Sequence, residues 1–304
     1  MKKVLLSLMV ISCYIPMFNV EAQTEKAQRS FSAEIVTSDG NKLMLSHLHY
    51  VYTESHDTGR YVNFPDTISS RLGGMEHLAI DIFCGRLFTP FHLISRLETL
   101  GKEHDAVRHI DRIKVRVFFK SGEMLEGKFG YQFNASLAGE GAFGVIAVAL
   151  DKIATVTFSG EATTSRTFDL PKGRPGGPFV ISNGAEKITG ITLIDIGTFK
   201  NQLNVLSSLE SIKVGGMTMS LDFSKIAKIF LTPLTQEPNR VMGKNMLEII
   251  LNSGERVKGD FLAGINTEPG IDYDPDHSII GKGELGIVLV SFFKPVTIVR
   301  EGIQ

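Results

Sequence analysis

The stretch KSGEMLEGKF, Lys120 to Phe129, recurs in the chain as NSGERVKGDF, Asn252 to Phe261, with five of the ten positions identical. Each copy places a Ser-Gly pair between residues that alternate between apolar and polar. Glycine supplies the positive φ that a tight turn between two strands requires, so each copy predicts a β-hairpin. Weaker copies, with Asp39-Gly40 and Asn183-Gly184 at the turn, predict two further hairpins.

A second repeated sequence pattern, which we call the phrase, follows each hairpin. It begins near a glycine, continues as a short apolar strand, turns at a Pro, Asp or aromatic residue, and ends in another apolar strand. In LDFSKI the Asp is suited to cap a single helical turn, and in TPFHLI the Pro fixes φ at the same place. The four copies are CGRLFTPFHLISRL (84–97), FGVIAVALDKIATVTF (143–158), GGMTMSLDFSKIAKIFL (215–231) and LGIVLVSFFKPVTIV (285–299).

The hairpins and phrases together predict four diverged units. The turn glycines at 40, 122, 184 and 254 give the spacing of these units. The connector at 159–178 is the longest and the richest in Gly and Pro, which marks a domain boundary. We therefore predict an all-β protein of two lobes, residues 31–158 and 179–300, each made of two hairpin and strand-turn-strand units that form small barrels or sandwiches.

The order of glycine, apolar strand, Pro or Asp, one-turn helix and closing strand resembles the end of SH3-like small barrels. GRLFTPFHLI (85–94) is the nearest match, and the likeness is one of fold. Such barrels are mostly binding modules, and secreted bacterial versions hold cell-wall or protein ligands, which is what the resemblance implies for this chain. The first unit departs from the pattern, because Ser46 stands where the other units have Gly127, Gly190 and Gly259, and it should differ in strand geometry.

The N-terminus has the pattern of an export signal. Two lysines precede an apolar run from Val4 to about Phe18, and Val20-Glu21-Ala22 provides a small-residue cleavage site. This order predicts a secretory signal peptide over residues 1–22 and a periplasmic or secreted protein. The alternative is lipid anchoring at Cys13, because the residues before it resemble a lipobox. The rest of the sequence has no apolar run long enough for a transmembrane helix.

Composition narrows the range of partners. The formal net charge is −1, and no segment provides the basic face that phosphate backbones require, which argues against nucleic acid. If Cys13 leaves with the signal peptide, Cys84 is the single cysteine, so an intrachain disulfide is excluded. We expect Cys84 to be a buried structural thiol.

His47 and His49 are a candidate metal site. They lie two residues apart on a predicted strand, so their imidazoles should share one face. A zinc site needs at least a third ligand, which the sequence does not place.

A second candidate metal site is the acidic loop at 268–277, which falls in an insertion. Asp272, Asp274 and Asp276 stand at alternate positions there, as oxygen ligands of Ca²⁺ can. An EF-hand is excluded, because the sixth and twelfth positions are His277 and Gly283. Metal binding at either site stays open, and no cofactor is predicted.

The sequence contains no G-x-S-x-G elbow, no H-E-x-x-H motif and no phosphate-binding loop. The repeats and the missing motifs favour a non-catalytic binding or structural protein of the cell envelope, with a protein or a cell-wall polymer as its partner. The alternative is a metal-assisted or acid hydrolase that uses the His-rich first lobe or the acidic loop. A third interpretation is an assembly scaffold held together by pairing of edge strands.

Overall fold

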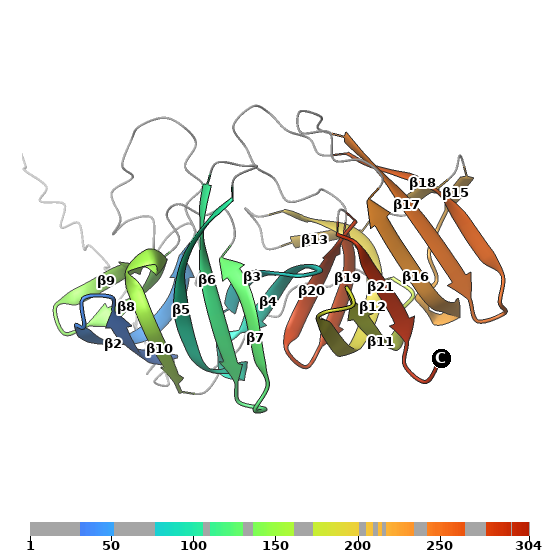
Figure 1. The fold of residues 1–304 in the computed structure, drawn as a ribbon. Helices are drawn as coiled ribbons and strands as arrows, with labels where there is room; N and C mark the ends of the chain where they lie inside the picture. Colours follow the sequence, from blue (N-terminus) through green and yellow to red (C-terminus); the bar gives the residue numbers. More distant parts are fainter. Residues whose placement is uncertain are drawn as a thin grey trace, which may run out of the picture.

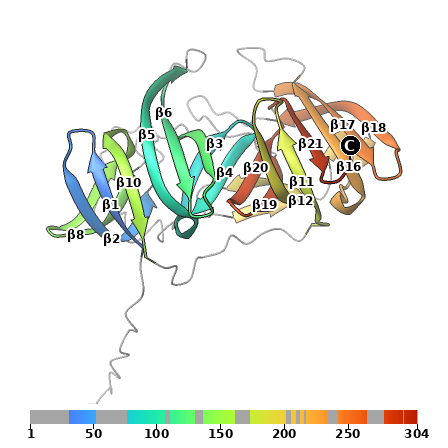
Figure 2. The ribbon, with the colours of Figure 1, turned by 60° about the horizontal axis from the view of Figure 1, so that its bottom comes forward.

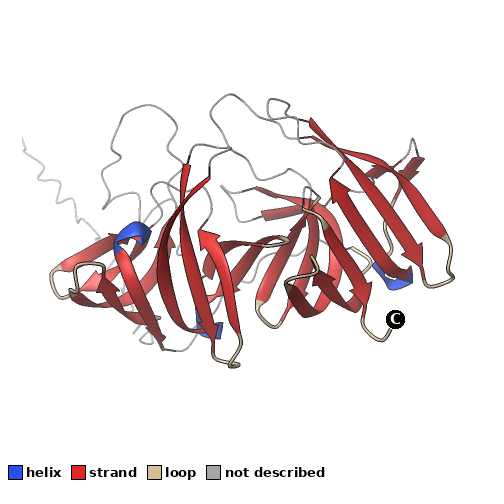
Figure 3. Ribbon diagram, in the orientation of Figure 1, coloured by secondary structure: helices blue, strands red, loops and turns tan. Residues whose placement is uncertain are grey.

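The described part of the chain is built almost entirely of antiparallel strands (Figure 1). The computed structural model describes residues 31–51, 77–105, 110–129, 136–160, 173–200, 205–208, 212–214, 217–233, 242–264, 278–292 and 294–303. Within these residues the only helices are three 3₁₀ turns, η1, η2 and η3 (Figure 3). The predicted all-β class is confirmed.

In the first half of the chain the described residues form ten strands and two of the 3₁₀ turns. They are β1 (Ser32–Thr37), β2 (Lys42–Val51), β3 (His77–Ile82), β4 (Gly85–Pro90), η1 (Phe91–Leu93), β5 (Ile94–Asp105), β6 (Ile110–Phe119), β7 (Met124–Phe129), β8 (Ser136–Gly141), β9 (Gly144–Ala149), η2 (Leu150–Lys152) and β10 (Ile153–Ser159).

The second half holds the remaining eleven strands and η3. They are β11 (Gly176–Ser182), β12 (Lys187–Lys200), β13 (Val205–Ser208), β14 (Ile212–Val214), β15 (Met217–Met219), η3 (Phe223–Lys225), β16 (Ile226–Pro233), β17 (Met242–Leu251), β18 (Arg256–Gly264), β19 (Ser278–Gly283), β20 (Gly286–Ser291) and β21 (Val296–Arg300).

All four predicted hairpins are present, as β1–β2, β6–β7, β11–β12 and β17–β18. Their turn glycines have φ of +88°, +93°, +92° and +86° in chain order, so each turn uses the conformation that predicted it. The alternation that predicted β6 is also confirmed, because Val115 and Val117 are fully buried and Arg116 between them is not.

Helical turns are present inside the first three phrases, as η1, η2 and η3, and the turn of the fourth phrase includes residue 293, which lies outside the described residues. Pro90 precedes η1 with φ of −64°, the value that the proline ring imposes. Asp222 caps η3, where its carboxylate accepts a hydrogen bond of 3.1 Å from the backbone N–H of Ser224. A short polar cap or a fixed φ is therefore enough to turn the chain from one strand into the next.

Strand pairing differs from the order along the chain. The first hairpin, β1–β2, pairs with β10, which closes the second phrase, and with β8, which precedes that phrase. The second hairpin, β6–β7, pairs with β5, which closes the first phrase, and with β3, which precedes that phrase. The predicted units, in which each hairpin packs with the phrase that follows it, are wrong in this respect. The reason is the short connection between β5 and β6, which makes these strands antiparallel neighbours and leaves the edge of β2 for β8.

The same pairing order occurs in four sets of strands. Each set runs from the last strand of a phrase, its closing strand, through the two hairpin strands to the strand that precedes the phrase, and ends on the first strand of the phrase. Set 1 is β10–β1–β2–β8–β9, set 2 is β5–β6–β7–β3–β4, set 3 is β21–β11–β12–β19–β20, and set 4 is β16–β17–β18–β14–β15. Strand β13 adds to β12 alone among the described strands.

The sets join edge to edge. Closing strands join set 1 to set 2 through β10–β5 and set 3 to set 4 through β21–β16, and the last strands join set 2 to set 3 through β4–β20 (Figure 2). Strand β10 ends at Ser159 and β11 begins at Gly176, inside the predicted linker, of which residues 161–172 lie outside the described part. The division into two lobes and the closure into small barrels stay predictions.

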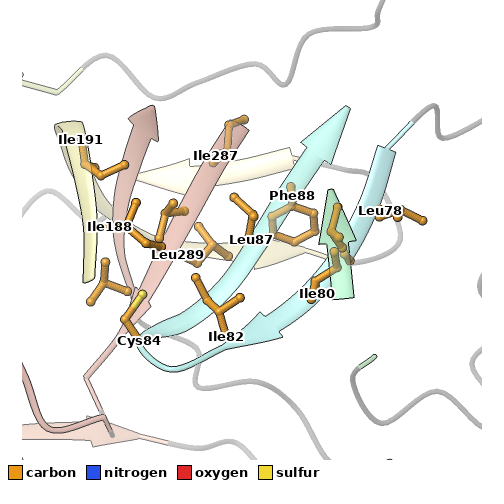
Figure 4. Close-up of a cluster of buried hydrophobic side chains, with 14 of the residues drawn as sticks. Leu78, Ile80, Ile82, Cys84, Leu87, Phe88, Ile188, Ile191, Ile287 and Leu289 are labelled. Carbon is orange, nitrogen blue, oxygen red and sulfur yellow. The ribbon is translucent and has the colours of Figure 1, made fainter. Parts of the chain in front are cut away.

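The apolar core continues through the β4–β20 junction. Side chains from β3, β4, β12 and β20 meet there in one buried cluster (Figure 4). The members include Leu78, Ile80, Ile82, Cys84, Leu87, Phe88, Ile188, Ile191, Ile287 and Leu289. Burial of apolar surface stabilises this junction in the way it stabilises a domain interior.

Candidate functional site

The β4–β20 junction shows how the last strand of one set receives the last strand of another. Counted from the glycine that begins each strand, the second residue faces the fourth and the third faces the third. The facing pairs are Phe88–Ile287, Leu87–Val288, Arg86–Leu289 and Gly85–Val290. The register is therefore symmetric about the Leu87–Val288 pair, as it would be between two identical strands.

The two glycines make this close approach possible. A Cβ on Gly85 would lie 2.0 Å from the carbonyl oxygen of Leu289, and a Cβ on Gly286 would lie 2.1 Å from that of Phe88. In each case the oxygen belongs to the fourth residue of the facing strand. Their φ values, +148° and +129°, are also ones that only glycine adopts readily. Each strand therefore needs glycine at its first position.

Strand β9 is the counterpart of β20 in set 1. Its sequence GVIAVA matches GIVLVS of β20 in pattern, and both strands begin at a positive-φ glycine after a two-residue turn. Gly144 has φ of +106°, yet no heavy atom of the described residues would lie within 4 Å of its Cβ. In the described part of the chain no strand pairs with the outer edge of β9.

The backbone groups on that edge follow from the turn. Gly141 and Gly144 close the two-residue hairpin, so the N–H and C=O groups of Gly144 point toward β8. Along a strand these groups alternate in direction, so those of the next residue, and of every second residue after that one, point away from β8. The outward N–H and C=O groups belong to Val145, Ala147 and Ala149. In β20 the equivalent of the last of these, Ser291, donates its N–H to the Cys84 carbonyl at 2.9 Å.

The β9 edge is apolar, and no strand of the described residues pairs with it. Phe143 is 97% exposed and Val145 is 61% exposed, whereas Ile287, the counterpart of Val145, is 7% exposed. The segment from Gly141 to Leu150 contains no charged residue. Natural edge strands are usually protected by charge, proline or a bulge, and β9 has none of these. We take the β9 edge, residues 143–149, as the candidate functional site.

Sequence reasoning did not single out this edge. Its signal was the uncharged run GAFGVIAVAL, which was taken only as one copy of the phrase. The copies alone do not show which of them is paired, because the partner strand comes from a distant part of the chain.

The two histidines of the first metal candidate lie at a bulge in β2. His47 has φ of +49°, and the register with β8 shifts between Ser46 and His49. The geometry of this strand therefore departs where Ser46 replaces glycine, as predicted. His47 Nδ1 lies 3.2 Å from Glu140 Oε2, on an exposed surface. Burial, followed by the charge of His47, lowers the pKa of His49.

The structure describes the first of the two metal candidates and not the second. Among the described residues, no three His, Cys, Asp or Glu side chains form a group able to hold a metal ion. Asp272, Asp274 and Asp276 lie outside the described residues, so the acidic loop stays a prediction.

Cys84 is fully buried in the turn between β3 and β4. Burial raises the pKa of its thiol to about 12, which keeps the thiol protonated and unreactive at neutral pH. The prediction of a buried structural cysteine is confirmed.

An ion cluster supports the strand that forms the junction. Asp81 on β3 accepts a hydrogen bond of 2.8 Å from Nε of Arg86 on β4, and Nη1 of Arg112 on β6 lies 3.3 Å from its other oxygen. The three side chains are mostly buried, so the charges are held in fixed positions. The sequence did not predict this cluster, because its members come from three different strands.

His77 gives the protein an expected sensitivity to acid. Burial lowers the pKa of His77 to about 4, and its ring lies against Phe88 at 5.9 Å between centroids. As the pH falls below the unfolded value of about 6.5, the unfolded chain binds the proton first. The contribution that neutral His77 makes to the free energy of unfolding is therefore fully present above about pH 6.5. This contribution, on the order of 3 kcal/mol, is lost as the pH falls from there to about pH 4.

The measurement is urea unfolding of the parent and His77→Leu at about pH 7 and about pH 5. We expect the variant to lose less stability than the parent over this interval. An equal loss in both proteins would show that His77 does not carry the effect.

No protein-family model, curated protein or solved structure matches the chain. The functional conclusion therefore rests on the geometry.

Proposed function

We propose that the protein is an exported, non-catalytic binding or structural component of the cell envelope that binds by adding a strand to the β9 edge. The observation that carries the proposal is the contrast between β9 and β20. The two strands match in pattern, yet β20 is covered by β4 and β9 is open among the described residues. An extended apolar segment fits such an edge, since its backbone completes the ladder.

The pKa values of Cys84 and His77 favour a structural rather than a catalytic role for these two groups. Catalytic groups have pKa values tuned toward neutral pH. Here burial moves the pKa of the Cys84 thiol to about 12 and that of His77 to about 4, away from neutrality in both cases. The hydrolase alternative would use the His-rich first lobe, where no three metal-binding side chains come together among the described residues, or the acidic loop, which lies outside them.

Export is inferred from the sequence of residues 1–22, with its lysines, apolar run and small-residue cleavage site. None of the helical turns in the described part of the chain has the length or apolar character that a membrane-spanning helix needs. Mass spectrometry of the N-terminus after export would show cleavage near Ala22 or, in the lipoprotein alternative, a lipid on Cys13.

The test of function is co-sedimentation of the protein with purified cell-wall sacculi and, separately, with outer-membrane vesicles that retain their proteins. We expect saturable binding that Val145→Lys weakens by at least about tenfold, because a charged edge opposes strand addition. Met124→Lys is the matched control, since Met124 is 54% exposed but lies on β7.

Two outcomes would contradict the proposal. No binding to either preparation would exclude a partner in the cell envelope. Equal binding by the two lysine variants would exclude the β9 edge as the binding site. A parallel sample with EDTA tests the acidic loop, because loss of binding there would point to Asp272, Asp274 and Asp276.

A further inference from the structure

We propose that the protein forms a symmetric dimer in which β9 of one copy pairs antiparallel with β9 of a second copy. The inference rests on the proposed function, which makes β9 a binding edge, and it names the partner. In this arrangement Ile146 faces Ile146 of the second copy across a two-fold axis, and Val145 faces Ala147 of the second copy.

The template for this pairing is the junction inside the chain. Strands β4 and β20 have the same place in their sets, and their register is symmetric about Leu87 and Val288, the third residue of each. Ile146 is the third residue of β9. Because the register is symmetric, two copies of one strand satisfy it equally well and form a closed pair.

Gly144 provides the most specific support. Each glycine of the internal junction makes room for the carbonyl oxygen of the fourth residue in the facing strand. Ala147 is the fourth residue of β9, so its oxygen in the second copy would lie above Gly144. Gly144 has the positive φ of the other two glycines, and its neighbourhood is empty of described atoms. The space beside Gly144 is therefore open in the described structure, and the Ala147 carbonyl oxygen of a second copy would occupy it.

The β9 edge is also compatible with itself. Since residues 141–150 contain no charged side chain, two copies would not repel each other. The outward N–H and C=O groups of Val145 and Ala147 would be exchanged between the copies as two reciprocal pairs. The N–H of Ala149 would reach the Phe143 carbonyl, as that of Ser291 reaches Cys84.

The other unpaired last strand favours a dimer over a fibre. Strand β15 occupies the same place in set 4, and no described strand pairs with its outer edge. Its first residue is Met217, where β4, β9 and β20 have glycine. Strand β15 therefore lacks the position that receives a carbonyl oxygen, and among the described strands the β9 edge finds a matching open edge only in β9 of a second copy. The two strands lie at opposite ends of the molecule (Figure 1).

The first test is sedimentation velocity of the full chain over a range of concentrations, with Gly144→Ala and Gly101→Ala as variants. Both glycines have nearly the same φ, +106° and +109°, and neither has a described atom near a Cβ position. The backbone strain in the monomer is therefore matched. We expect a monomer–dimer equilibrium that Gly144→Ala weakens at least about tenfold and Gly101→Ala leaves unchanged.

The second test is oxidative cross-linking. Residues at the axis form a non-hydrogen-bonded pair with Cα atoms about 4.5 Å apart, which a disulfide can span. We expect Ile146→Cys to form a covalent dimer above the level of the parent chain. Phe143→Cys, although its position is far more exposed, should not exceed the parent, because the two copies of residue 143 would lie at opposite ends of the paired strands.

A chain that stays monomeric at every concentration, with no cross-link through Ile146→Cys, would overturn the dimer. Cross-linking that follows exposure, with Phe143→Cys the stronger, would overturn it as well. If the monomeric chain still bound the envelope preparations and Val145→Lys abolished that binding, the proposed function would stand with another partner on β9.

Discussion

Gly286→Ala is expected to reduce the free energy of unfolding by about 4 kcal/mol, since backbone strain and overpacking each contribute about 1–3 kcal/mol. The strain comes from φ of +129°, and the overpacking comes from a Cβ placed 2.1 Å from the carbonyl oxygen of Phe88. That oxygen belongs to β4, in the other half of the chain. The change should therefore loosen the contact between the halves as well as the local turn.

Gly144→Ala is the control, because it imposes similar strain in the equivalent turn without the clash. Urea unfolding of dilute samples should show it to be less destabilising than Gly286→Ala by at least about 2 kcal/mol. Equal effects of the two variants would mean that β4 does not press on β20 as described.

Arg300→Ala is expected to cost about 4 kcal/mol, because it removes several hydrogen bonds from a charged donor, each worth about 1.5–3 kcal/mol. Its guanidinium donates to the carbonyls of Phe223 at 2.7 Å, Ile226 at 2.9 Å and Ser224 at 3.1 Å. It also lies 4.8 Å from the ring centroid of Phe179. One side chain therefore ties β21 to η3 and to the start of β16.

Two further variants separate these causes. Arg300→Lys should recover little of the loss, since an ammonium group cannot reach the same carbonyls as a planar fork. Arg96→Ala is the control, because Arg96 also lies over a ring, that of Phe118 at 5.9 Å, but is exposed, so a cost below about 1 kcal/mol is expected. Thermal unfolding of the three variants would decide, and full stability in Arg300→Lys would contradict the role of the fork.

Local signals predicted the local structure well. Gly40, Gly122, Gly184 and Gly254 predicted four hairpins because a positive φ is a property of a single residue, which a sequence displays directly. The same holds for Asp222, whose cap on η3 involves a residue only two positions away.

Non-local pairing could not be predicted in the same way. Strands β2 and β7 are both apolar on one face, and nothing in either sequence states whether β3 or β8 will be its neighbour. The choice depends on the short β5–β6 connection and on the total apolar surface that each arrangement buries. The sequence did not predict the candidate site for the same reason. A strand edge is open only when no other strand pairs with it, and the sequence does not show which strands pair.

The His47 and His49 candidate has no third ligand among the described residues, for a different reason. Alternation places side chains on faces but does not supply a third ligand, and the structure adds Glu140 to His47 without completing a metal group among the described residues. Sequence spacing is informative on ligand sets only when the ligands share an element.

The most direct test of the account is residue-resolved hydrogen exchange on the dilute chain, which compares the outward amides of β9 with those of β20. The account predicts fast exchange at Val145 and Ala147 and strong protection at Ile287 and Leu289, which β4 covers. Raising the protein concentration should then protect Val145 and Ala147. Equal protection of both strands in the dilute chain would show that another part of the same molecule covers β9, and the open edge, on which the proposed function rests, would be contradicted.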